Sequence, residues 1–138
     1  MIDRCCDDFL IAFESALVGR RRVTLADCIR AIVEATLVSH HLTPEVHRIV
    51  LALAPRIGFA EKAENVSRSA AKTIEVVLRK HVDEIAPDID MATAATVIET
   101  VLEALAHRAV LAHPVHLEDD LLAKEATRLI RGYLTLGG

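Results

Sequence analysis

The fold of this chain is decided by two consecutive segments, ATAATVIETVLEALAHRAVLAHP (residues 92–114) and HLEDDLLAKEATRLIRGYL (residues 116–134). The apolar residues of the first segment cover an arc much wider than the roughly 100° stripe of a surface helix. A helix this apolar must be covered on two sides, by its own domain and by a partner. Its polar residues keep mostly to one stripe, Thr96, Thr100, Glu103 and His107.

Helical periodicity runs through the rest of the chain, where five glycines and four prolines fall at points at which helices should stop. Thr24 is the predicted N-cap of the second helix, and Asp88 or Asp90 that of the fifth. The residues of the second helix that are spaced to face inward are Leu25, Ile29, Ile32, Val33 and Leu37. Pro87 is expected to close a single long fourth helix. The pattern predicts one all-α domain spanning residues 1–138, with six helices over residues 2–18, 24–41, 43–54, 59–86, 90–113 and 118–134.

Two phrases in the last helices, EALAHR (residues 103–108) and LIRGYL (residues 129–134), resemble the C-terminal pattern of tetracycline-repressor (TetR) family regulators. The resemblance extends back to Met1 and covers the ligand-binding and dimerisation part of that family. The family's N-terminal helix-turn-helix has no counterpart in these residues, so we expect DNA contact only through a domain absent from this chain.

The resemblance implies a helical bundle that forms a homodimer through its last two helices, in a cytoplasmic transcriptional repressor. A stand-alone helical interaction module, whose last two helices recruit another protein, is the alternative. An enzyme or metal carrier ranks third. The residues expected in the dimer interface are Val97, Val101, Leu105, Ala109, Leu122, Leu129 and Tyr133.

In TetR-like domains the first helix of this part also borders the effector cavity, together with the second, fourth and fifth. Here an apolar first helix would face an alanine-rich fourth helix, which leaves room for a ligand. Few ionisable groups fall on these faces, so the expected effector is a small, hydrophobic and weakly charged molecule. The residues expected to line the cavity are Cys6, Phe9, Phe13, Ile29, Val33, Ala70, Ile74 and Leu102.

Charge and cysteine usage narrow the functional classes. A net charge of −4 is the opposite of a nucleic-acid-binding footprint, and the one basic run, residues 20–22, follows a helix end, where cations are favourable anyway. Three cysteines without CxxC spacing favour a reducing compartment. Acidic neighbours disfavour thiolates at Cys5 and Cys6, so packing explains these two better than redox sensing. No apolar run approaches the length of about 18 residues that spans a membrane.

Three histidine-containing groups are candidate metal sites, and none predicts a metal or a cofactor. The first, around His40, His41 and His47, lacks a carboxylate or thiol that would complete a ligand set. In the second, Pro114 breaks the helix that would hold the ligands on one face; its members are His113, His116, Asp119 and Asp120. The third group, Glu99, Glu103 and His107, shares one helical face, but its Glu-to-His interval is one residue longer than that of di-iron bundles. No glycine-framed serine or phosphate loop occurs, so no enzyme is predicted.

Overall fold

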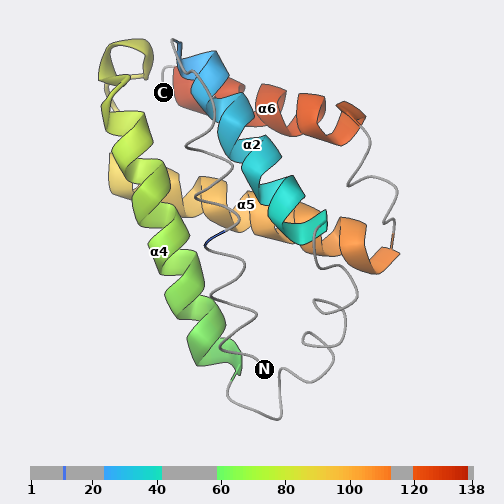
Figure 1. The fold of residues 1–138 in the computed structure, drawn as a ribbon. Coiled ribbons are helices and arrows are strands. Elements are labelled where there is room, and N and C mark those ends of the chain that lie inside the picture. The colour runs from blue at the N-terminus through green and yellow to red at the C-terminus, as the bar shows by residue number, and fades with distance from the viewer. Residues whose placement is uncertain (1–10, 12–23, 42–58, 113–119, 137–138) are drawn as a thin grey trace.

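The described part of the chain is built from helices alone. The computed structural model describes residues 11, 24–41, 59–112 and 120–136 (Figure 1). No strand occurs among these residues, which confirms the all-α prediction. The predicted helices over residues 2–18 and 43–54 lie outside them, apart from Ile11, which is helical and exposed, so the count of six stays a prediction. The elements are α2 (Leu25–His41), α4 (Phe59–Arg79), the 3-10 helix η2 (Val82–Glu84), α5 (Met91–Ala112) and α6 (Asp120–Thr135).

Helix α2 contacts α4, α5 and α6 and lies between α4 and α6 in Figure 1. The buried hydroxyl of Thr36 donates a hydrogen bond to the carbonyl of Ile32 at 3.0 Å, so it leaves no unsatisfied polar group. Removing a side chain of leucine or isoleucine size from water contributes about 1.5–3 kcal/mol. All five positions that the sequence predicts to face inward are buried, namely Leu25, Ile29, Ile32, Val33 and Leu37.

The predicted N-caps of two helices are confirmed. At the start of α2, the hydroxyl of Thr24 accepts the backbone N–H of Asp27 at 3.2 Å, and the Asp27 carboxylate accepts the N–H of Thr24 in return. Of the two candidate caps for α5, Asp90 fills the role. Its Oδ2 accepts the backbone N–H of Thr93 at 3.0 Å and the hydroxyl of the same residue at 2.6 Å, and these bonds hold the pKa of Asp90 below its ordinary value.

The predicted single helix over residues 59–86 is wrong at its C-terminal end. Helix α4 ends at Arg79, and the chain then tightens into η2 through bonds such as the one from the Ile85 N–H to the carbonyl of Val82 at 3.2 Å. Val82, which the helical pattern places inside, is therefore exposed, whereas Ile85 remains buried. The break brings His81 and Glu84 to the N-terminus of α2, where both make polar contacts described below.

Helix α5 packs most extensively on α4, and α6 packs mainly on α2, whereas α5 and α6 contact one another little. At the C-terminal end of α6, Leu134 is fully buried and its carbonyl accepts the N–H of Ala86 at 2.9 Å. At the other end, Arg30 of α2 forms an ion pair with Asp120. Both ends of α6 are thus fixed by contacts away from α5. No described helix is both long and apolar enough to cross a membrane.

Candidate functional site

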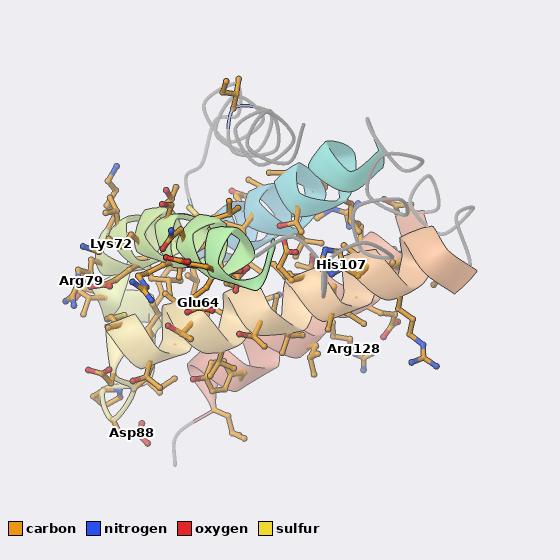
Figure 2. The ribbon with its side chains drawn as sticks, turned by 90° about the horizontal axis from the view of Figure 1, so that it is seen from below. Glu64, Lys72, Arg79, Asp88, His107 and Arg128 are labelled. Carbon is orange, nitrogen blue, oxygen red and sulfur yellow. The ribbon has the colours of Figure 1, made fainter. Side chains whose placement is uncertain are left out.

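A polar pocket of about 380 Å³ lies between α4 and α5. Figure 2 shows Glu64 of α4 at the junction of these two helices. Three of the four residues in the predicted polar stripe of α5 line this pocket. The full lining consists of Glu64, Ser67, Arg68 and Ala71 from α4, and Thr96, Glu99, Thr100 and Glu103 from α5.

Glu99 is the unusual residue of this pocket. Its side chain is 7% exposed, and its Oε1 is a buried atom without a hydrogen-bond partner. Burial raises the pKa of Glu99 to about 7, and the negative charge of Glu103 adds to the effect, whereas a hydrogen bond with Ser67 opposes it. A buried carboxyl with an unused oxygen costs free energy, so it requires a local explanation.

The basic side chains near Glu99 contact other carboxylates. Arg68 lies 3.6 Å from Glu64 in an ion pair whose two side chains are mostly exposed. His107 Nε2 lies 3.0 Å from the Oε2 of Glu103, one helical turn away. Three carboxylates therefore share the pocket with a single guanidinium, and neither ion pair satisfies the Oε1 of Glu99.

The threonine hydroxyls of the pocket already donate hydrogen bonds to backbone carbonyls. The hydroxyl of Thr96 donates to the carbonyl of Ala92 at 3.2 Å, and that of Thr100 donates to the carbonyl of Thr96 at 2.8 Å. A hydroxyl that donates to the backbone keeps its lone pairs free to accept. The α5 wall therefore offers acceptors and negative charge to whatever enters.

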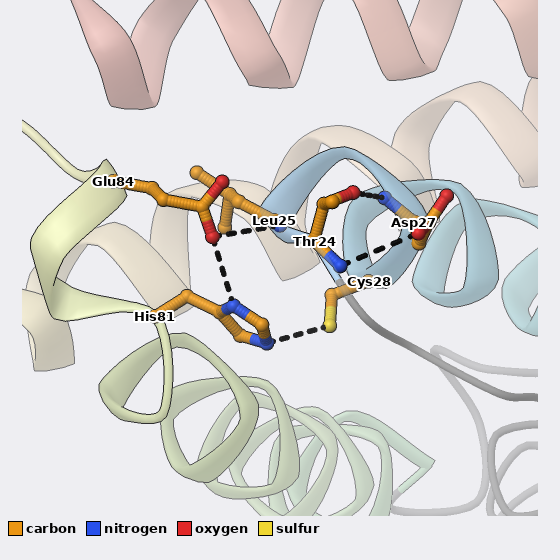
Figure 3. Close-up of polar contacts among 6 residues, drawn as sticks. All are labelled: Thr24, Leu25, Asp27, Cys28, His81 and Glu84. Atoms are coloured by element: carbon orange, nitrogen blue, oxygen red, sulfur yellow. Dashed lines mark hydrogen bonds and ion pairs between the residues drawn. The ribbon is translucent and has the colours of Figure 1, made fainter.

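A second polar cluster joins α2 to the segment after α4. His81 lies between Cys28 and Glu84, with its Nε2 3.1 Å from the cysteine Sγ and its Nδ1 3.1 Å from the Glu84 Oε2 (Figure 3). The same carboxylate oxygen accepts the N–H of Leu25 at 3.1 Å, an amide at the start of α2. A cysteine, a histidine and an acid in this order resemble a nucleophilic triad. The Cys28 residue, however, is only 1% exposed, so its thiol is not accessible to a substrate. The cluster instead holds the start of α2 against the segment that follows α4.

The residues predicted to line an apolar effector cavity divide into two groups. Cys6, Phe9 and Phe13 lie outside the described residues. The five others are buried together in one hydrophobic core, and none of them lines the polar pocket, although the pocket residue Ala71 follows Ala70 directly. The apolar cavity itself stays a prediction. The five buried residues are Ile29, Val33, Ala70, Ile74 and Leu102.

The residues predicted for the dimer interface follow a gradient of exposure on α5 and α6. Val97 is 40% exposed, Leu129 58% and Tyr133 39%, although all three are large and apolar or aromatic. Val101, Leu105 and Leu122 are partly buried, and the last two also pack against the core. Ala109 is covered by its own chain. The described chain thus leaves apolar side chains of its last two helices without cover.

The other candidate residues from the sequence lie mostly outside the described part of the chain. His47, His113, His116, Cys5, Cys6 and residues 20–22 lie outside the described residues, and only the backbones of His40 and His41 are described. Within the described part, no three histidine, cysteine, aspartate or glutamate side chains are arranged to hold a metal ion. Sequence reasoning missed the partnership of Cys28 with His81, because these residues lie 53 positions apart.

The residues that the structure describes thus form helices only, with an acidic pocket between α4 and α5 and an exposed apolar face on α5 and α6. A family model described as "Tetracyclin repressor-like, C-terminal domain" matches residues 24–134, a span that holds nearly all of the described structure. The chain therefore belongs to the family of TetR-like C-terminal domains, as the phrases in its last two helices indicate. The comparisons with curated proteins and with solved structures gave no match.

Proposed function

We propose that this chain is the effector-binding and dimerisation domain of a TetR-like transcriptional repressor. The observation that carries the proposal is the family match over residues 24–134, since domains of this family serve such regulators. DNA recognition is assigned to a separate helix-turn-helix domain. The acidic balance of the chain agrees with this division, because duplex binding depends on neutralising phosphates with basic side chains.

The exposed apolar side chains of α5 and α6 support dimerisation as part of this proposal. Val97, Leu129 and Tyr133 are left in solvent by their own chain, and an apolar face of this kind marks an interaction surface. A twofold pairing would cover the same residues on both copies at once. The interface proposed is the predicted one, and an obligate homodimer of this type typically buries upwards of about 2,000 Å².

Helix α5 would couple the two roles, because it carries pocket residues and interface residues on adjacent faces. Thr96 and Thr100 line the pocket, whereas Val97 and Val101 belong to the proposed interface. A ligand that binds one orientation of α5 more tightly shifts the population toward the dimer geometry that contains it. In a repressor, that geometry would space the DNA-binding domains wrongly for the operator.

A repression assay in cells tests the proposal. Residues 1–138 are fused behind a DNA-binding domain that represses a reporter only when it is dimerised. We expect the fusion to repress, and the same fusion carrying Leu129→Glu to release the reporter while accumulating to the same level. A wild-type fusion that leaves the reporter fully active would contradict homodimerisation. It would favour the stand-alone interaction module, whose exposed face serves a different protein.

A further inference from the structure

We propose that the pocket between α4 and α5 binds a small organic cation, an ammonium or amidinium compound, and that Glu99 is its counter-ion. The inference rests on the proposed function, because it names the chemical class of the effector. It replaces the weakly charged effector expected from the sequence with one that carries a positive charge.

The first argument is the state of Glu99 itself. The side chain is more than nine-tenths buried, and its Oε1 has no partner, although it belongs to a residue that lines an open pocket. An N–H donor on a ligand would supply the missing hydrogen bond, and a charged donor would form the stronger, charge-assisted kind. The Ser67 hydroxyl bonds this carboxyl, but the Oε1 is left without a partner among the side chains of the pocket.

The second argument is the charge and hydrogen-bond pattern of the whole lining. Glu64, Glu99 and Glu103 outnumber the one guanidinium of Arg68, which is paired with Glu64 at 3.6 Å. The threonine hydroxyls of α5 donate to backbone carbonyls and keep only acceptor positions. An anion would meet repulsion from the ionised carboxylates, and a neutral acceptor would find no free hydroxyl donor on Thr96 or Thr100. A donor-rich cation complements both properties.

The third argument concerns the kind of cation. A divalent metal requires several oxygen or nitrogen ligands arranged around one point, and the described residues contain no group of three suitable side chains so arranged. A volume of about 380 Å³ falls within the range of small-molecule sites. Ala71 adds an apolar patch to the polar lining, so a cation with a compact hydrocarbon body suits the pocket better than a bare ion.

Binding should depend on pH through the groups that face Glu99. These are Glu64 and Arg68 from α4, and Glu103 and His107 from α5. With the pKa of Glu99 near 7, the carboxylate is the minor form at pH 6 and the major form at pH 8, so affinity for a permanently charged cation should rise about tenfold between them.

Matched ligands of equal shape and different charge test the proposal. Benzamidinium and cyclohexylammonium are titrated into the full chain at pH 8 and followed by two-dimensional NMR, with benzamide and cyclohexanol as neutral counterparts. We expect at least one of the two cations to bind, with amide shifts clustered at residues of the pocket, and the neutral compounds to bind at least about tenfold more weakly. Failure of both cations at millimolar concentration, or equal binding of a cation and its neutral counterpart, would overturn the proposal.

Two variants separate the role of Glu99 from a general attraction to an acidic protein. Glu99→Gln keeps the shape of the side chain and removes its charge, so it should weaken cation binding at least about tenfold and abolish the pH dependence. Asp88→Asn removes a carboxylate from an exposed turn away from the pocket (Figure 2) and should leave binding unchanged. Equal losses in both variants, or none in Glu99→Gln, would contradict the assignment. The molar mass of each sample is also measured by light scattering. A dimer that does not bind the cations would refute only the proposed cation site. A monomer that binds them would refute only the proposed homodimer.

Discussion

Leu129→Glu should convert the protein from a dimer to a monomer without unfolding it. Leu129 is 58% exposed in the single chain, so a glutamate there stays in water while the chain is alone. In the proposed dimer the same carboxylate would be desolvated without a partner. Because the dimer is twofold symmetric, this desolvation cost occurs once in each copy. A cost of about 3 kcal/mol raises the dimer dissociation constant more than a hundredfold. Sedimentation velocity measures this change, and circular dichroism should show unaltered helix content.

The chain offers a matched control on another helix. Val76 lies on α4 and is 57% exposed, so Val76→Glu introduces the same charge at the same exposure outside the proposed interface. This variant should sediment as the wild type does. Leu129→Lys should dissociate the dimer as Leu129→Glu does, which excludes rescue by a neighbouring arginine. Equal behaviour of Val76→Glu and Leu129→Glu would show that the α6 face has no special part in assembly.

Glu99→Gln should change how the stability of the protein depends on pH. The pKa of Glu99 is about 7 in the folded chain and near 4.5 when unfolded, so the native state holds the extra proton between these values. The free energy of unfolding contributed by this group therefore falls as pH rises from 5 to 8, by an amount on the order of 2 kcal/mol. The glutamine variant has no such proton to lose. It should be more stable than the wild type at pH 8, and the difference should shrink toward pH 5.

Urea unfolding, followed by circular dichroism at one fixed protein concentration, measures this difference, because the stability of a dimer depends on concentration. Asp88→Asn is the control, since Asp88 lies in an exposed turn away from the pocket (Figure 2). That variant should keep the pH slope of the wild type. Parallel curves for wild type and Glu99→Gln would show that the buried carboxyl does not carry an unfavourable charge at neutral pH.

The helices of this protein follow from local sequence signals wherever those signals are strong. The cap residues Thr24 and Asp90 and the inward positions of α2 could be predicted, because capping and periodicity act within a few residues. The end of α4 could not. Apolar residues keep helical spacing up to Pro87, at Val82 and Ile85, and nothing local reveals that His81 and Glu84 make polar contacts with the start of α2.

The sequence predicts the polar stripe that lines the pocket but not the burial of Glu99. The polar stripe of α5 is visible in the spacing of Thr96, Thr100 and Glu103, and these residues do line one cavity. Nothing in that spacing reveals that Glu99, which has polar neighbours on the same face, is buried against α4. Burial depends on the crossing of two helices that lie far apart in the sequence. The expectation of a weakly charged effector came from the apolar faces of the predicted cavity, and it stays a prediction.

The molar mass of the wild-type protein in solution tests most directly whether this domain works as a dimer. Static light scattering at micromolar concentration and physiological salt should give twice the chain mass of 15.1 kDa, because the apolar side chains left exposed on α5 and α6 are proposed to be covered by a second copy. The mass should hold on dilution within that range, as expected for an obligate interface. A mass of 15.1 kDa under the same conditions would contradict homodimerisation through this face.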